Sequence, residues 1–335
     1  MREIKLTKQL VEAWLIPVEP YKLFHYTAVL DGGKFSSPED QSHLRKIFHD
    51  LALQRKVKPS GNRDGYYVVI PQVKPIRRLE GATGGIIDFA WPCGHGGDNS
   101  SFGFEGLMTV SEGDLILLGG VSNFGKTAII LNMLGENLDK YSCLLMGNEY
   151  VNADQTVTGK FRRRMTRMSW ADWTDSEGNL KFILLPVNTG YEDYIEKDKI
   201  NIIDWLNIPQ GQGFYEIAPI MKAIKDRLGK GLAVVVEQKT RGKEFADGGE
   251  FSERFADIYL TIDPFGENES RLTVGKVKEP KERVSGRSWA FSIVDYGANL
   301  HRIREVKKCF KCWGHGYTKM GKCDSCLGKG YIDMD

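Results

Sequence analysis

Apolar residues in the middle of the chain occur in short runs that predict β-strands, and amphipathic stretches between them predict helices. The apolar runs cover residues 114–118, 142–146, 200–203, 232–236, 258–262 and 272–274. One helix is predicted from residue 126 onward, and another over residues 216–228. Because strands that alternate with helices usually pair in parallel, the predicted fold class is α/β with a mostly parallel sheet.

The first 72 residues predict a smaller module. Residues 37–40 (Ser-Pro-Glu-Asp) combine a capping hydroxyl, an early proline and acidic side chains, which is typical of a helix start. Apolar residues then follow at helical spacing: Leu44, Ile47, Phe48 and Leu51. Residues 56–58 and 66–70 flank a turn-rich SGNRDG segment and predict a β-hairpin. A helix followed by a hairpin resembles a winged-helix domain.

Basic side chains gather on the predicted helix and hairpin of this winged-helix-like module. They are His43, Arg45, Lys46, Arg55, Lys56, Lys58 and Arg63. Such residues can contact the phosphates of DNA. The same charges can also form a solvated face of a module that binds protein, so both interpretations stay open.

Composition and charge narrow the class of protein. A chain of 335 residues has room for two or three domains, and 41% hydrophobic residues exclude wholesale disorder. The formal net charge of +2 excludes a uniformly basic coat, so any contact with nucleic acid must come from local patches. No apolar run reaches 18 residues, and the N-terminal sequence lacks the apolar core of a signal peptide. We therefore expect a cytoplasmic protein without membrane contact.

Residues 120–127 read GVSNFGKT, which matches the phosphate-binding loop of nucleotide-binding proteins. Glycines allow the backbone to approach a phosphate, while amide hydrogens and the helix N-terminus attract its charge. Lys126 is expected to reach the β- and γ-phosphates of ATP, and the Thr127 hydroxyl to bind Mg²⁺. The predicted nucleotide-binding residues are Gly120, Val121, Ser122, Asn123, Phe124, Gly125, Lys126 and Thr127.

Two carboxylates are candidates for the chemistry of hydrolysis. Glu149 follows the strand after the phosphate-loop helix, and Asp204 ends the next apolar run. Ligands of open α/β sheets bind at the carboxyl ends of the strands, so both side chains are expected to face the nucleotide. The alternative is that each carboxylate only caps a strand or starts a helix.

The order of these features resembles the RecA-type ATPase core, especially the C-terminal motor domain of DnaB-type hexameric helicases. The resemblance covers roughly residues 104–300. It implies that Glu149 is the base that orients the attacking water and that Asp204 serves Mg²⁺. It also implies that Gln238, in VVVEQKT, senses the γ-phosphate.

The same resemblance implies an oligomer. Lys276 and Lys278, in VGKVKEP, would stabilise transition-state charge in the ATP site of a neighbouring subunit. A lone subunit is then expected to be a poor ATPase. The expected assembly is a homo-oligomeric ring, such as a hexamer, or a filament.

Two glycine-rich segments, residues 207–215 and 240–249, stand where the family places its DNA-gripping loops. Lys239, Arg241 and Lys243 can meet phosphate oxygens of DNA there, with single-stranded DNA the expected partner. An ordinary surface loop explains the composition equally well. A winged-helix-like module is expected in place of the usual amino-terminal domain of replicative helicases, so the resemblance supports ATPase activity more strongly than helicase activity.

The C-terminal region contains two copies of CxxCxGxG, with Cys309, Cys312, Cys323 and Cys326 as candidate Zn²⁺ ligands. Four thiolates complete a tetrahedral shell, which predicts a structural rather than a catalytic zinc site. The repeats resemble the cysteine-rich repeats of DnaJ-type co-chaperones, and the module can bind nucleic acid or protein. Cys93 and Cys143 stand alone, and Cys143 lies in an apolar run that predicts a buried thiol.

The predicted domain order has four parts. A winged-helix-like module covers residues 1–72, a linker 73–103, a RecA-like ATPase domain 104–304, and a four-cysteine zinc module 305–335. The function predicted from these parts is an ATP-hydrolysing, oligomeric DNA-binding motor. One alternative is an ATP-dependent assembly switch or loader that recruits protein partners on nucleic acid without unwinding it. Another is phosphoryl transfer to a substrate other than water, and DNA and RNA are not distinguished.

Overall fold

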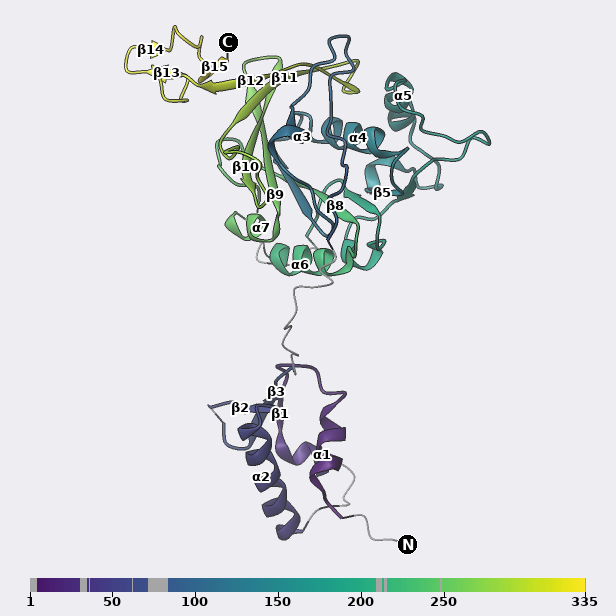
Figure 1. Ribbon diagram of the computed structural model, residues 1–335, viewed down its shortest axis with the longest axis vertical. Coiled ribbons are helices and arrows are strands. Elements are labelled where there is room, and N and C mark those ends of the chain that lie inside the picture. Colours follow the sequence, from purple (N-terminus) through teal and green to yellow (C-terminus); the bar gives the residue numbers. More distant parts are fainter. Residues whose placement is uncertain are drawn as a thin grey trace. The chain divides into compact units, whose positions relative to one another are not determined.

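A computed structural model describes residues 5–30, 35, 37–61, 63–71, 84–208, 213, 216–247 and 249–334. The chain divides into two compact units, Met1–Ala82 and Thr83–Asp335 (Figure 1). No helix in the described ranges is long and apolar enough to cross a membrane.

The described residues of the N-terminal unit form three helical segments and a small antiparallel sheet. Its elements are α1 (Lys8–Leu15), β1 (Leu23–His25), a 3-10 helix (Tyr26–Leu30), α2 (Pro38–Leu53), β2 (Val57–Pro59) and β3 (Tyr66–Val69). The strand order is β1-β3-β2, so the predicted hairpin of β2 and β3 is confirmed and β1 adds a third strand.

Helix α2 begins as its sequence predicts. The Ser37 hydroxyl accepts a hydrogen bond from the Asp40 amide at 3.1 Å, which caps the helix. The apolar face of α2 is buried in one cluster with residues of α1 and the 3-10 helix. Helix α1 packs Val11 and Leu15 into this cluster, although the sequence pattern gave no prediction for it.

The second unit is organised around a sheet whose first half is parallel. Its strands are β4 (Leu115–Gly120), β5 (Cys143–Met146), β6 (Ile183–Leu185), β7 (Ile200–Ile203), β8 (Leu232–Gln238) and β9 (Ile258–Phe265). The spatial order is β9-β4-β8-β7-β5-β6, and every neighbouring pair is parallel. Strand β4, which leads into the phosphate loop, therefore lies inside the sheet between β8 and β9. The predicted α/β fold class with a parallel sheet is confirmed.

Four further strands extend the sheet from β9 in antiparallel fashion. They are β10 (Glu269–Val277), β11 (Ser288–Val294), β12 (Asn299–Lys308) and β15 (Tyr331–Asp333). Short turns join β9 to β10 and β11 to β12, as antiparallel pairing allows, whereas parallel neighbours need longer crossover connections. The ten-stranded sheet is thus mixed, with its parallel half carrying the phosphate loop.

Helices cover both faces of the parallel half, so side chains of one strand alternate between two cores. In β4, Ile116 and Leu118 belong to the cluster that contains α4 (Lys126–Asn137). Leu115 and Leu117 belong to the cluster that contains α6 (Ile217–Arg227). Burial on both faces explains why these strands are continuous apolar runs in the sequence. The other α-helices among the described residues of this unit are α3 (Phe104–Leu107), α5 (Gly159–Arg167) and α7 (Glu250–Phe255).

Residues 84–103 differ from the expectation of a linker. Phe89, Trp91 and Phe102 are buried in the same cluster as α4. Their aromatic area provides a large burial gain, so irregular backbone rich in glycine packs here as part of the domain. Residues 73–83 of the predicted linker lie outside the described part of the chain.

The four-cysteine region is attached to the large sheet by two of its strands. Strand β12 crosses the predicted boundary at residue 304, and its end pairs with β15 from Val306↔Asp333 to Lys308↔Tyr331. Between these strands lies a two-stranded ribbon of β13 (Tyr317–Thr318) and β14 (Gly321–Lys322). The four-cysteine region is therefore continuous with β12, a strand of the large sheet.

Candidate functional site

The phosphate loop lies at the carboxyl end of β4 and runs directly into α4. Asn123 and Gly125 adopt left-handed backbone conformations, with φ of 68° and 99°. The φ of Gly125 favours glycine, and a Cβ atom at this position would also displace the end of the Ile293 side chain. The Ser270 hydroxyl donates to the Phe124 carbonyl at 2.9 Å and ties the loop to β10. The loop is therefore held in one shape by its neighbours.

The Lys126 side chain is buried at the centre of this loop. Its Nζ donates to the carbonyls of Gly120 at 2.8 Å and Val121 at 3.2 Å. It also donates to Gln238 Oε1 at 2.9 Å, and the Ser122 hydroxyl reaches the same oxygen at 3.1 Å. Gln238, the last residue of β8, is thus connected to both the lysine and the loop.

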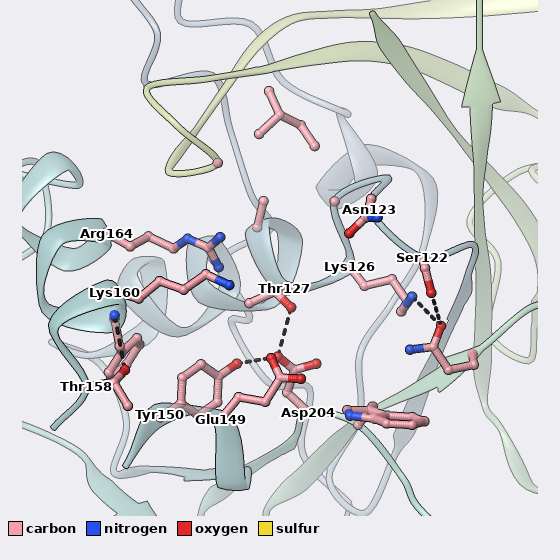
Figure 2. Close-up of a pocket in the computed structure, with 17 residues that line it drawn as sticks. Ser122, Asn123, Lys126, Thr127, Glu149, Tyr150, Thr158, Lys160, Arg164 and Asp204 are labelled. Atoms are coloured by element: carbon pink, nitrogen blue, oxygen red, sulfur yellow. Dashed lines mark hydrogen bonds between the residues drawn. The ribbon is translucent and has the colours of Figure 1, made fainter. Parts of the chain in front are cut away.

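Asp204 follows β7 and is buried beside the start of α4 (Figure 2). Its Oδ2 accepts a hydrogen bond from the Thr127 hydroxyl at 3.0 Å and another from the Tyr150 hydroxyl. Burial raises the pKa of Asp204, while the hydrogen bonds from Tyr150 and Thr127 oppose that shift. Burial also lowers the pKa of Lys126, and the Asp204 carboxylate opposes that change.

Glu149 lies in a 3-10 helix (Asn148–Tyr150) that follows β5, and its side chain is exposed toward the same cavity (Figure 2). The cavity has a volume of about 740 Å³, within the range of small-molecule sites. The predicted site residues that line it are Ser122, Asn123, Gly125, Lys126, Thr127, Glu149, Asp204 and Gln238. The structure thereby gathers the phosphate loop, both carboxylates and the glutamine around one space.

Helix α5 contributes residues to the cavity that sequence reasoning did not identify. Lys160 and Arg164 extend from it into the cavity opposite the phosphate loop (Figure 2). Thr158 caps this helix by accepting from the Phe161 amide at 3.3 Å. The available signals were Phe161 and Met165 at helical spacing within the basic run KFRRRMTR. Other residues that line the cavity are Ala128, Tyr150, Trp205, Ile293 and Gly297.

Lys276 and Lys278 lie away from this cavity. Strand β10 pairs with β9 so that Lys276 is opposite Tyr259, near the amino end of β9, whereas the phosphate loop follows the carboxyl end of β4. Lys276 Nζ donates to the Glu253 carbonyl at 2.7 Å, and Lys278 Nζ donates to Asp257 Oδ1 at 2.7 Å. Neither lysine lines the cavity beside the phosphate loop of its own chain.

The segments expected to grip DNA are described only in part, because residues 209–212, 214, 215 and 248 lie outside the described ranges. Lys239 is buried and pairs with Asp263 at 2.5 Å, so its ammonium group is not free to meet phosphates. Arg241 and Lys243 are exposed and line a second cavity of about 770 Å³.

The four C-terminal cysteines converge as the sequence predicts. Their Sγ atoms lie within 4.8 Å of one another, and all four residues are buried and free of disulfides. The separations are 3.9 Å for Cys309 and Cys323, and 3.6 Å for Cys312 and Cys326. Four thiolates bound at 2.3 Å around a tetrahedral zinc ion would be about 3.8 Å apart. The donor set and its spacing fit one Zn²⁺.

No protein-family model matches the chain, and no curated protein matches it. Similar solved structures include a KaiC-like protein from the hyperthermophilic archaeon Pyrococcus horikoshii OT3, with 16% identity and a TM-score of 0.46. That match covers 65% of this chain and 98% of the other. The RadB recombinase matches with 12% identity and a TM-score of 0.42, over 57% of this chain and 90% of the recombinase. In this chain the phosphate loop follows β4, an inner strand of the parallel half of the sheet.

Proposed function

We propose that this chain binds ATP with Mg²⁺ and hydrolyses it. The observation that carries the proposal is the convergence of Lys126, Thr127, Asp204 and Glu149 on one cavity at the carboxyl edge of a parallel sheet. A phosphate loop alone would support nucleotide binding. Two carboxylates at the same cavity add the groups that hydrolysis requires.

The phosphate loop and α4 would hold the triphosphate. Backbone amides of residues 120–127 and the N-terminus of α4 favour negative charge, and Lys126 would exchange its carbonyl partners for phosphate oxygens. Thr127 and Asp204 offer the oxygen ligands that Mg²⁺ prefers, and Thr127 Oγ1 lies 3.0 Å from Asp204 Oδ2. Bound Mg²⁺ would neutralise phosphate charge.

Glu149 would accept a proton from the attacking water, since its side chain is exposed to the cavity. Gln238 would sense the γ-phosphate, because it bonds Lys126 and Ser122 and ends the strand that leads to residues 240–249. Lys160 and Arg164 add positive charge on the opposite wall, where it complements a polyphosphate.

We further propose that the chain works on DNA as an oligomer. Support comes from the helix-rich N-terminal unit with its three-stranded sheet, whose arrangement is compatible with a winged helix. Further support comes from the exposed Arg241 and Lys243, and from a four-cysteine module fit for zinc. The second candidate is an assembly switch that uses the same ATP site without unwinding.

An ATPase assay on the full chain tests these proposals. We expect phosphate release that requires Mg²⁺ and rises several-fold with single-stranded DNA, alongside an assembly larger than one chain in solution. An ATPase rate that does not change on addition of single-stranded DNA would favour the assembly switch. Transfer of labelled phosphate to a group other than water would support a kinase instead. Failure of the chain to bind ATP would overturn the proposed function.

The variant Glu149→Gln separates binding from chemistry. We expect it to retain ATP affinity but to hydrolyse ATP at least about 100-fold more slowly, because the amide cannot accept a proton. The matched control is Glu177→Gln, which changes a glutamate in an exposed turn away from the cavity. Normal turnover by Glu149→Gln would remove Glu149 from the proposed role.

A further inference from the structure

A cysteine, a histidine and a glutamate, all residue types that can ligate a metal ion, meet at the end of α4 opposite the phosphate loop. Cys93 Sγ is 3.2 Å from His95 Nε2 and 3.0 Å from Glu136 Oε1. His95 Nε2 is 2.7 Å from the same Glu136 oxygen. One sulfur, one nitrogen and one oxygen thus meet at a point that belongs neither to the nucleotide cavity nor to the four-cysteine cluster.

Hydrogen bonds fix the position of the backbone around Cys93 and His95 relative to helix α4. Asn137, the residue after Glu136 on α4, makes two hydrogen bonds with the backbone of Ala90. The Ala90 amide donates to Asn137 Oδ1 at 3.0 Å, and Asn137 Nδ2 donates to the Ala90 carbonyl at 2.8 Å. Further along, the Gly94 amide donates to the Ser100 carbonyl at 2.6 Å. These bonds hold the Cys-Gly-His segment against the last turn of the helix.

The His95 ring is also held in place. It stacks on Trp170 with ring centroids 3.7 Å apart and an interplanar angle of 11°. The indole Nε1 of Trp170 donates to Asn299 Oδ1 at 2.9 Å, which fixes the tryptophan in turn. An imidazole supported in this way keeps one nitrogen directed at its ligand position.

The electrostatic surroundings favour a cation. Glu136 lies in the last turn of α4, where the helix dipole places negative potential. Among the described residues, its one ion-pair partner is His95, so no lysine or arginine competes for the carboxylate. The side chains of His95 and Glu136 are 22% and 18% exposed, which leaves access for a water ligand.

We propose that Cys93, His95 and Glu136 bind one zinc ion, with water as the fourth ligand. Bonds of 2.0–2.3 Å in a tetrahedron separate such ligand atoms by about 3.3–3.6 Å, so the three side chains need to move apart by only about half an ångström. The thiol proton passes to solvent as the Zn–S bond forms. Mixed thiolate, imidazole and carboxylate donors suit zinc. The ion would link residues 84–103 to α4.

Zinc content of the purified full chain, measured by elemental mass spectrometry, tests the proposal. We expect two zinc ions per chain in the wild type and one in Cys93→Ser. The double variant Cys323→Ser/Cys326→Ser should also retain one, because the two sites are independent. The matched control is Cys143→Ser, whose buried thiol belongs to neither group of ligands and whose loss should leave two ions bound.

A conservative variant distinguishes the loss of a zinc ligand from the loss of the fold. Glu136→Gln keeps the size and hydrogen-bonding capacity of the side chain but removes its charge, and we expect zinc affinity at this site to fall at least about tenfold by chelator competition. One zinc per wild-type chain, lost entirely in Cys323→Ser/Cys326→Ser, would overturn the proposal and leave a hydrogen-bonded cluster. Unchanged affinity in Glu136→Gln would overturn it as well.

Discussion

Lys126 carries the positive charge at the centre of the phosphate loop, and three protein oxygens hold it there. We expect Lys126→Ala to weaken ATP binding about 100-fold, since hydrogen bonds to charged groups contribute about 1.5–3 kcal/mol each. Titration with a fluorescent ATP analogue measures this loss. The matched control is Lys222→Ala on the exposed face of α6, which should bind normally. Equal affinities for the two variants would contradict the assigned site.

Glu237 gives the protein a pH-dependent stability, because burial raises the pKa of its carboxyl to about 8. The folded state keeps the proton that the unfolded state releases near its ordinary pKa of 4.5. The free energy of unfolding therefore keeps the full contribution of protonated Glu237 at low pH, and this contribution is lost as pH rises from about 4.5 to 8. The full loss is on the order of 5 kcal/mol, at about 1.4 kcal/mol per pKa unit.

Glu237→Gln should remove most of this dependence, because glutamine keeps the shape of the side chain and does not ionise. Urea unfolding at pH 5, 7 and 9 gives the free energy of unfolding for both proteins. The wild type should lose stability along this series, and the variant should lose much less. Parallel pH profiles would show that another group is responsible.

At the scale of elements, helix α5 supplies the wall that faces the phosphate loop. Arg164 lines the cavity, whereas Arg162 of the same helix is exposed and does not. We expect Arg164→Ala to weaken ATP binding about 5- to 20-fold through loss of a charge-assisted contact with phosphate. Arg162→Ala is the matched control and should bind as the wild type does. Equal effects from both variants would show that α5 acts only through its overall charge.

The sequence allowed prediction of those elements whose burial is uniform. Strands β4 and β8 are buried on both faces and therefore appear as apolar runs, and the phosphate loop and Asp204 follow from where such runs end. Strand β12 escaped prediction because its charged side chains form ion pairs with residues far away in the sequence. Arg304 pairs with Glu269 on β10 at 2.7 Å, and Glu305 pairs with Arg287, just before β11, at 2.6 Å. Such partners are distant in the chain, so a local pattern does not reveal them.

The same reasoning explains which site residues were missed. Glu149 follows an apolar strand, a position that a linear pattern identifies, whereas Gln238 at the end of β8 was expected only from the family resemblance. Arg164 reaches the cavity only because α5 packs Phe161 and Met165 against the core. Likewise, Cys93 and Glu136 meet across 43 residues of sequence, and no spacing rule connects them. Contacts made by tertiary packing are the part that sequence reasoning could not supply.

At the scale of the whole molecule, Lys276 and Lys278 lie near the amino ends of the parallel strands, while the cavity lies at their carboxyl ends. Any contact with a nucleotide therefore requires a second copy of the chain. Lys278 can leave its partner Asp257 to contact a second copy, because Asp257 would still be paired with Lys225. An interface of this kind is head-to-tail, which generates rings or filaments.

Mixing two inactive variants tests this arrangement. Lys276→Ala/Lys278→Ala keeps an intact cavity, and Glu149→Gln keeps intact lysines, so a mixed assembly contains interfaces with both parts. In an equal mixture about one quarter of head-to-tail interfaces join an intact cavity to intact lysines, and ATPase activity should recover to about that fraction of the wild type. Glu149→Gln mixed with Lys126→Ala should not recover, because every cavity is then damaged. If the first mixture gives only the average of its two components, the lysines act within their own chain, where their bonds to Glu253 and Asp257 stabilise the fold.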